Sequence, residues 1–137
     1  MDVLMFLLDT NIFLEWMLNR ENAGHVQELL ERADPSALAI SDFSMFSIGI
    51  IHVMYGRYRE YLTFLDQDIV KKGIQVMTLP LASHGILVEA AEKYRLDFDD
   101  AYQYALASLY GLRLASFDHH FDRTDEGRLE PGKDAIV

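Results

Sequence analysis

The sequence predicts an α/β protein, a three-layer α/β/α sandwich with a central parallel sheet of four or five short strands. Two observations lead to this prediction. Short apolar runs, of the form taken by strands that are buried on both faces, alternate along the chain with longer segments of helical periodicity. This alternation is typical of β-α-β units with right-handed crossovers, in which helices cover both faces of the sheet.

The first half of the chain supplies two of the strands. In chain order we predict a strand at residues 3–8, helices at 11–18 and 22–32, a strand at 37–41 and a helix at 43–56. Asn22 is expected to cap the second of these helices. The helix at 43–56 is apolar on nearly all sides, so it needs cover from the core or from a second subunit.

The second half continues the alternation. We predict a helix at residues 58–72, a strand at 74–79, helices at 82–94 and 97–109, and a strand at 112–117. Gly73 and Gly111 follow two of these helices, in the position where glycine commonly ends a helix. No linker, repeat or low-complexity segment divides the chain, so residues 1–137 are expected to form one domain.

Composition excludes several classes of protein and site. Cysteine is absent, which removes disulfides, thiolate metal sites and thiol nucleophiles. No apolar stretch is both long and charge-free enough to cross a bilayer, and the N-terminus lacks the basic region of a signal peptide. We therefore expect a cytoplasmic protein without membrane contact. The glycine-rich loops that bind nucleotide phosphates are also absent.

The chain is strongly acidic, with a formal net charge of −10. This charge argues against a broad basic surface that binds phosphate backbones unaided. An acidic protein can still process nucleic acid where bound cations reverse the local charge. A simple nucleic-acid-binding module is therefore disfavoured, while a metal-dependent nuclease remains open.

Several aspartates stand where the functional residues of a parallel sheet gather, at the carboxyl ends of the strands. Those predicted to reach this edge are Asp9, Asp42 and Asp118, which follow strands, and Asp97, Asp99 and Asp100, which begin a helix. Acids that are remote in the sequence are thus expected to meet at one edge of the sheet.

Each of these acids also has a structural interpretation. Asp97 can cap a helix. Asp99 and Asp100 in its first turn interact favourably with the helix dipole, and each stabilises the helix by roughly 0.3–1 kcal/mol. Asp9 can likewise cap the helix that follows it. Taken together, however, carboxylates in one partly buried site repel and raise one another's pKa. A divalent cation relieves this repulsion, and Mg²⁺ prefers oxygen ligands, so we favour a metal site over capping alone.

Four segments resemble the motifs of one protein family, in the family's order. They are LLDTNIFLE, ISDFSMFSIG, DFDDAYQYALA and LASFDHHFDR, and they span almost the whole chain. With these segments the chain resembles a PIN domain, and in particular a VapC-type toxin ribonuclease of a type II toxin–antitoxin system. The resemblance implies a PIN-like fold.

The resemblance also implies an activity, cofactors and partners. It implies a Mg²⁺- or Mn²⁺-dependent endoribonuclease, held inactive by a small VapB-type antitoxin, and a homodimer. Carried over to this sequence, Asp9 and Asp100 are the main catalytic metal ligands, and Asp118 completes the group directly or through water. Thr10 and Asn11 are expected to form hydrogen bonds within the turn and so fix Asp9. The RNA is expected to be single-stranded or looped at the cut, where a narrow acidic cleft can reach its backbone.

One position departs from the family pattern. Many members have a glutamate in the second motif, and this chain has Ser47 there, which supplies no carboxylate. Weaker candidates for the metal site are Asp42, Asp99, Asp122 and Ser47 itself. The missing carboxylate keeps an alternative open, in which a catalytically weakened PIN fold serves as an RNA- or protein-binding subunit.

Two histidines, His119 and His120, directly follow Asp118. They could bind metal or donate protons. Because the hard cation Mg²⁺ seldom recruits imidazole, we interpret both as exposed loop residues.

Overall fold

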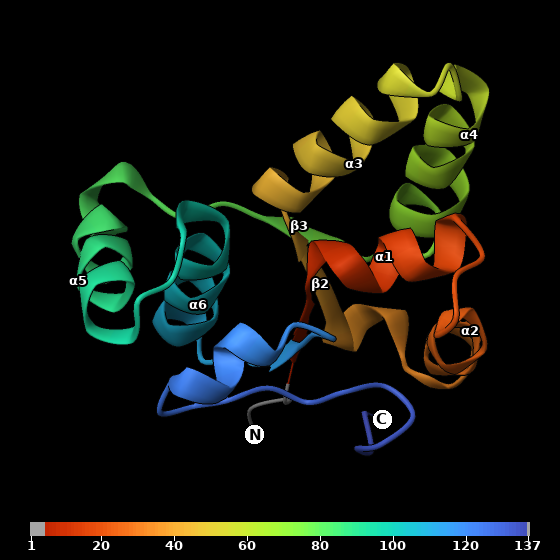
Figure 1. Ribbon diagram of the computed structural model, residues 1–137. Coiled ribbons are helices and arrows are strands. Elements are labelled where there is room, and N and C mark those ends of the chain that lie inside the picture. Colours follow the sequence, from red (N-terminus) through yellow and green to blue (C-terminus); the bar gives the residue numbers. More distant parts are fainter. Residues whose placement is uncertain (1–4, 137) are drawn as a thin grey trace.

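The computed structural model describes residues 5–136 and shows a parallel sheet between two layers of helices (Figure 1). The strand order is β3-β2-β1-β4, and each neighbouring pair is parallel. The strands are β1 (Phe6–Leu8), β2 (Leu38–Ser41), β3 (Gln75–Met77) and β4 (Arg113–Ala115). The predicted fold class is therefore confirmed. The predicted start of the first strand at Val3 lies outside the described residues.

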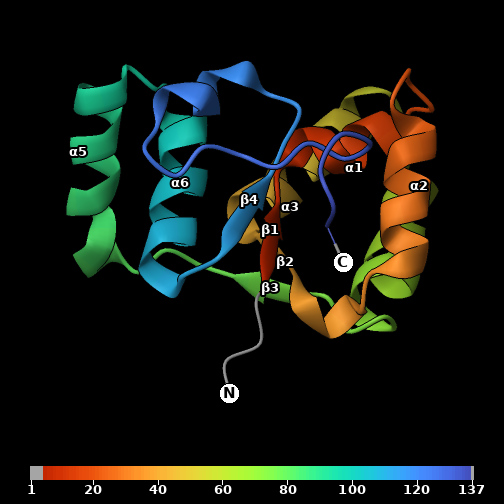
Figure 2. The ribbon, with the colours of Figure 1, turned by 90° about the horizontal axis from the view of Figure 1, so that it is seen from below.

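Helices connect the strands and cover both faces of the sheet. They are α1 (Thr10–Met17), α2 (Ala23–Arg32), α3 (Asp42–Met54), α4 (Tyr58–Thr63), α5 (His84–Tyr94) and α6 (Phe98–Tyr110). Figure 2 shows α5 and α6 on one side of the sheet and α1 and α2 on the other. Within residues 5–136, none of the helices combines the length and the apolar composition that a bilayer span requires.

The side chains of β1 explain why this strand is apolar throughout. Phe6 and Leu8 join the hydrophobic cluster on the side of α1 and α2, where Phe13 is fully buried. Leu7 points the other way, into the cluster that contains Leu106 of α6. Because successive side chains of a strand alternate between the faces, a strand between two helical layers buries every residue.

Short helices account for most differences from the predicted boundaries. Turns of 3₁₀-helix precede β2 and α5 and follow β4, at η1 (Pro35–Ala37), η3 (Leu81–Ser83) and η4 (His119–Arg123). The single helix predicted at 58–72 is α4 followed by a π-helical segment, η2 (Phe64–Val70), before Gly73 ends it. Asn22 precedes α2 as predicted, but its side chain makes no capping hydrogen bond.

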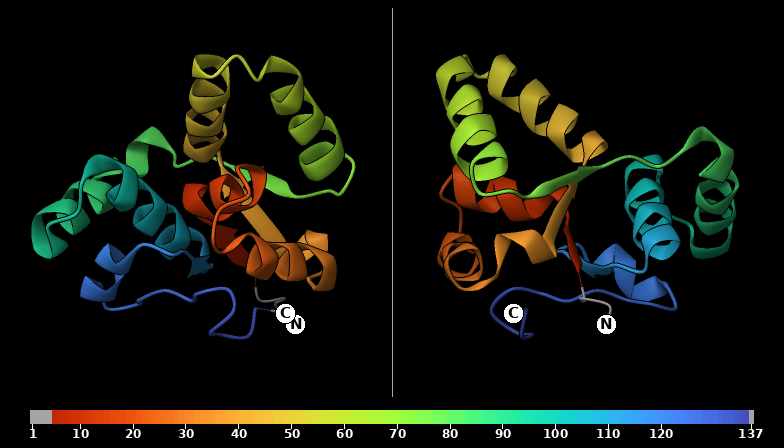
Figure 3. Two further views of the ribbon diagram at one scale, coloured as in Figure 1. Left: turned by 45° about the vertical axis from the view of Figure 1, so that its right-hand side comes forward. Right: turned by 180° about the vertical axis from the view of Figure 1, so that it is seen from behind.

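Helices α3 and α4 form a hairpin that projects from the sheet (Figure 3). One side of α3 packs inward through Met45, Ile48 and His52. Its other side, the outer α3 face, consists of Phe46, Ile50, Val53 and Met54, whose exposed fractions range from 52% to 73%. The prediction that this helix is apolar on nearly all sides agrees with the structure, in which the outer α3 face lacks cover from the described residues.

Candidate metal centre

Three segments bring one aspartate each to the carboxyl edge of the sheet. Asp9 ends β1 and is the N-cap of α1, and its backbone N–H donates to the carbonyl of Ala115 in β4 at 2.9 Å. Asp118 follows β4 as the N-cap of η4. Asp100 lies in the first turn of α6, whose N-cap is Asp97 as predicted. The capping interpretation thus holds for Asp9 and Asp97. The capping bond of Asp9 uses Oδ1, and both carboxylate oxygens also accept hydrogen bonds from other residues.

Asp9 is the most deeply placed of the three, with 6% of its surface exposed. Ser116 Oγ donates to Oδ2 at 2.7 Å, and Gln103 Nε2 donates to Oδ1 at 2.9 Å. Burial raises the pKa of Asp9, and the negative charge of Asp118 raises this pKa further, although the hydrogen bonds from Ser116, Gln103 and Thr10 oppose the change. A nearby cation would favour the ionised form of this carboxylate.

Asp100 and Asp118 lie close together, with His120 between them. His120 Nδ1 is 3.3 Å from Asp100 Oδ2 and 3.2 Å from Asp118 Oδ1. Burial, followed by the charges of Asp118, Asp97 and Asp9, raises the pKa of Asp100 to about 7. One ligand atom each of Asp100, Asp118 and His120 falls within 4.8 Å of the other two, a spacing that a metal ion can bridge.

A buried polar network supports Asp9 from the side of α3. Ser44 Oγ lies 2.7 Å from Thr10 Oγ1 and accepts a hydrogen bond from Gln103 Nε2 at 2.7 Å. Gln103 is 2% exposed, and its Oε1 has no hydrogen-bond partner among the described residues. A buried acceptor without a partner costs free energy unless a donor or cation satisfies it. Carboxylates beside such an oxygen form a donor set that fits a divalent cation with a preference for oxygen.

A family model described as the PIN domain matches residues 6–127. This chain belongs to the PIN domain family. Comparison with curated protein sequences gives no significant match.

Solved structures share the fold of this PIN domain at low sequence identity. A toxin–antitoxin complex from Klebsiella pneumoniae matches with a TM-score of 0.74 and 20% identity, covering 93% of this chain and 98% of that chain. FitAcB from Neisseria gonorrhoeae has a TM-score of 0.72 at 20% identity, with coverage of 93% and 98%. VapC20 from Mycobacterium tuberculosis, described as a sarcin-ricin loop cleaving toxin, has a TM-score of 0.69 at 13% identity, with coverage of 82% and 89%.

The structure of this PIN domain does not bring the weaker site candidates into the acidic group. The carboxylate of Asp42 accepts hydrogen bonds from Tyr102 at 2.6 Å and from Thr78 at 3.1 Å, so it joins α3 to α6 and to the end of β3. Asp99 is exposed on the first turn of α6. Ser47 is half-buried on α3 and offers only a hydroxyl.

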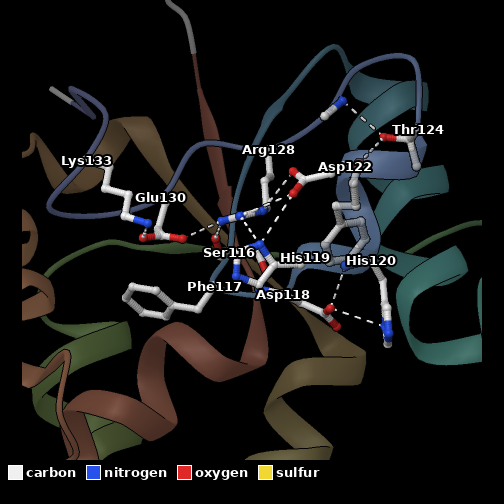
Figure 4. Close-up of polar contacts among 12 residues, drawn as sticks. Ser116, Phe117, Asp118, His119, His120, Asp122, Thr124, Arg128, Glu130 and Lys133 are labelled. Carbon is white, nitrogen blue, oxygen red and sulfur yellow. Dashed lines mark hydrogen bonds and ion pairs between the residues drawn. The ribbon is translucent and has the colours of Figure 1, made fainter.

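Asp122 is likewise engaged elsewhere. Arg128 Nε lies 3.1 Å from Asp122 Oδ1, and this guanidinium lowers the pKa of Asp122. In Figure 4 the pair of Asp122 and Arg128 lies on the opposite side of the loop from the carboxylate of Asp118. An ion pair of this kind satisfies the carboxylate without a metal ion.

One local expectation is corrected. The side chains of Thr10 and Asn11 do not bond within their own turn: Thr10 contacts Ser44, and Asn11 Nδ2 donates to Ser116 Oγ at 3.2 Å. Both histidines are exposed, as expected, and lie in η4, but the ring of His120 faces two of the three carboxylates.

Sequence reasoning missed the residues that support the acids. Gln103 lies one helical turn after Asp100 on α6, so the same helix face that presents Asp100 also presents Gln103. Ser116 lies two positions before Asp118, at the end of β4. Both spacings are visible in the sequence, but an amide or a hydroxyl carries no charge signal that would single it out.

Proposed function

We propose that this PIN domain is a metal-dependent endoribonuclease that uses Mg²⁺ or Mn²⁺ to cleave RNA at a single-stranded or looped position. The observation that carries the proposal is that Asp9, Asp100 and Asp118 lie at the same edge of the sheet, where burial and the charges of neighbouring acids raise the pKa of Asp9 and Asp100. A cation bound at this site would relieve the electrostatic repulsion among these carboxylates.

In this proposal Asp9, Asp100 and Asp118 hold the metal. When bound there, a divalent ion would act as a Lewis acid on the scissile phosphate and would lower the pKa of an attacking water. Gln103 and Ser116 fix the orientation of the Asp9 carboxylate through their hydrogen bonds at 2.9 and 2.7 Å. Asp118, the least buried of the three acids, orients the water.

Electrostatics limits how the substrate reaches this site. The chain carries a net charge of −10, so its surface repels a phosphate backbone as a whole. Binding therefore depends on positive charge at the acidic group itself. An unpaired stretch of RNA can expose its backbone and bases at such a narrow site, whereas a regular duplex cannot.

We further propose that the chain is the toxin of a toxin–antitoxin pair, with a small VapB-type antitoxin as its partner and a homodimer as its working form. The fold shared with a toxin–antitoxin complex supports the first part. The apolar outer α3 face supports a protein partner, because contiguous exposed apolar surface commonly marks an interface. Expression of the chain alone should arrest growth, and co-expression of a cognate VapB-type antitoxin should relieve the arrest.

The direct test of the nuclease is a cleavage assay with a panel of structured and unstructured RNAs, with Mg²⁺ or Mn²⁺ and with EDTA. Wild type should cut an unpaired position only when metal is present. Asp9→Asn removes the charge but keeps one acceptor oxygen for Gln103 or Ser116, so it should fold normally and lose at least about a hundredfold in rate. Cleavage by Asp9→Asn at the wild-type rate would contradict the assignment.

The second candidate function is a catalytically weakened PIN domain that binds RNA or protein. The observation that favours it is Ser47, which stands where many family members have a carboxylate. A thermal-shift titration separates the two. A working site gains stability from Mn²⁺ by mass action, and an inert module shows no metal-dependent change in Tm.

A further inference from the structure

The two neighbouring histidines after Asp118 occupy different environments. His119 Nδ1 lies 2.8 Å from a guanidinium nitrogen of Arg128 and 3.4 Å from Asp122 Oδ2, away from the acidic group. His120 Nδ1 lies 3.2 Å from Asp118 Oδ1 and 3.3 Å from Asp100 Oδ2. Of the two histidines, only His120 therefore presents a ring nitrogen to Asp100 and Asp118.

The backbone of η4 is anchored on both sides of His120. The N–H of His120 donates to Asp118 Oδ1 at 2.8 Å, which fixes the first turn of η4. The next residue, Phe121, is fully buried, and its carbonyl accepts a hydrogen bond from Thr124 Oγ1 at 2.8 Å. Figure 4 shows Asp118 and His120 on the same side of this loop. The His120 side chain is 54% exposed, and its ring nitrogen lies toward Asp100 and Asp118.

Within residues 5–136, Asp100 and Asp118 are the carboxylates within 4 Å of the His120 ring nitrogen. Ser47 leaves the second motif without a carboxylate, and Asp42 is bound to Tyr102. At the same time the buried Gln103 Oε1, on the amide that holds Asp9, has no hydrogen-bond partner among the described residues. The ligand atoms of Asp100, Asp118 and His120 lie within 4.8 Å of one another, so the imidazole is placed to complete the set.

We propose that His120 is a direct nitrogen ligand of the metal in this site, and that the site therefore prefers Mn²⁺, Co²⁺ and Ni²⁺ to Mg²⁺. This inference rests on the proposed function, which supplies the metal. Imidazole suits transition-metal ions, whereas Mg²⁺ favours oxygen ligands, so one nitrogen among the carboxylates shifts the selectivity in this direction. His120 thus takes over part of the role that a second-motif carboxylate would have.

The test measures metal binding without RNA. Titration of the metal-free protein with Mn²⁺, followed by the EPR signal of the free ion, gives the Kd. Electron spin-echo envelope modulation of the bound Mn²⁺ reports whether a ¹⁴N nucleus is coordinated. Wild type should show ¹⁴N modulation, and His120→Ala should lose it and bind Mn²⁺ about tenfold more weakly or worse. His119→Ala is the matched control, one position away, and should keep both the modulation and the affinity.

A third variant tests selectivity. His120→Asp replaces nitrogen with oxygen at the same place, so it should bind metal without ¹⁴N modulation and shift the preference toward Mg²⁺. Asp100→Asn should abolish Mn²⁺ binding, alone or combined with the histidine substitutions. This loss would show that the ion measured is the one at this site.

Two outcomes would overturn the inference, and they are distinguishable. In the first, Asp100→Asn loses Mn²⁺ binding, but the Mn²⁺ bound to wild type shows no ¹⁴N modulation. His120 is then not a ligand, and the proposed nuclease site stands. If Asp100→Asn binds Mn²⁺ as tightly as wild type, the metal lies elsewhere, and both the inference and the proposed function fail.

Discussion

A single carboxylate shows how burial and chemistry are linked in this site. Asp9 is almost fully enclosed, yet it keeps hydrogen bonds from Ser116, Gln103 and the Thr10 backbone. These bonds satisfy the oxygens but do not neutralise the charge, and burial still raises the pKa of Asp9. The hydrogen bonds therefore reduce the free-energy cost of burying Asp9, but its charge stays uncompensated until a cation is near.

The raised pKa of Asp100 makes the unfolding free energy of the protein depend on pH. Its folded pKa of about 7 lies above the ordinary value of 3.8. Between these values the folded, metal-free protein binds a proton that the unfolded chain has released. The stability from this group is therefore present at low pH, falls as pH rises through the window by at most about 1.4 kcal/mol per pH unit, and levels off above it.

Asp100→Asn should remove this dependence. In EDTA, the difference in unfolding free energy between the variant and wild type should shift in favour of the variant from about pH 5 to about pH 8. Urea unfolding of both proteins at the two pH values measures it. The same pH dependence in both proteins would contradict a raised pKa at Asp100.

At this scale the sequence identified the acids better than their supports. Asp9, Asp100 and Asp118 were found because strand ends and family motifs mark them. Gln103 and His120 were not, because the direction of a side chain on α6 or η4 depends on tertiary packing that a sequence pattern does not give. The catalytic and metal-binding roles of the three acids stay predictions.

At the scale of elements, α3 and α6 are held together beside the site by one tyrosine. Tyr102 OH donates to Asp42 Oδ1 at 2.6 Å and accepts from the backbone N–H of Leu79 at 2.9 Å. Burial of the ring and the hydrogen bond to Asp42 raise the Tyr102 pKa to about 12. This contact fixes the N-terminal end of α3 against α6, which carries Asp100.

Tyr102→Phe should therefore destabilise the fold. Loss of the hydroxyl leaves the Leu79 N–H and an Asp42 oxygen without this partner, which costs about 1–3 kcal/mol. Tyr104→Phe is the control on the same helix, because its hydroxyl meets the exposed Asp125, and it should cost about 0.5 kcal/mol or less. Chemical denaturation measures both. Equal losses in the two variants would show that the Tyr102 contact has no special weight.

The elements themselves could be predicted closely, and their ends less so. Apolar runs located all four strands, yet β4 pairs only over Arg113–Ala115 while the predicted run extends from 112 to 117. Apolar character continues past the last residue that pairs with a neighbouring strand, so hydrophobicity overestimates strand length. The π-helical segment Phe64–Val70 was not predicted, because helical periodicity does not distinguish it from an α-helix.

At the scale of the whole molecule, topology creates the site. The order β3-β2-β1-β4 puts β1 and β4 side by side, so Asp9 and Asp118 meet although they lie at opposite ends of the chain. The helix that precedes β4 then brings Asp100 to the same edge. The sequence predicted this convergence from parallel strands alone, without the strand order.

The outer α3 face concerns the whole molecule, because residues 5–136 of one copy leave it exposed. If this face holds two copies together, light scattering should report a dimer. Ile50→Lys, at the centre of the face, should then give a folded monomer, because burying an unpaired charge is costly. Leu81→Lys changes an equally apolar residue that is 85% exposed elsewhere and should leave the dimer intact. A dimer that survives Ile50→Lys would place the interface elsewhere.

If Asp9, Asp100 and Asp118 share one divalent cation, a crystal structure of the protein with Mn²⁺ will show it, because anomalous scattering locates the ion. We expect an anomalous peak between Asp100 and Asp118, with the carboxylate of Asp9 directed at it. Carboxylates splayed apart, with no anomalous density between them, would rule out the shared ion.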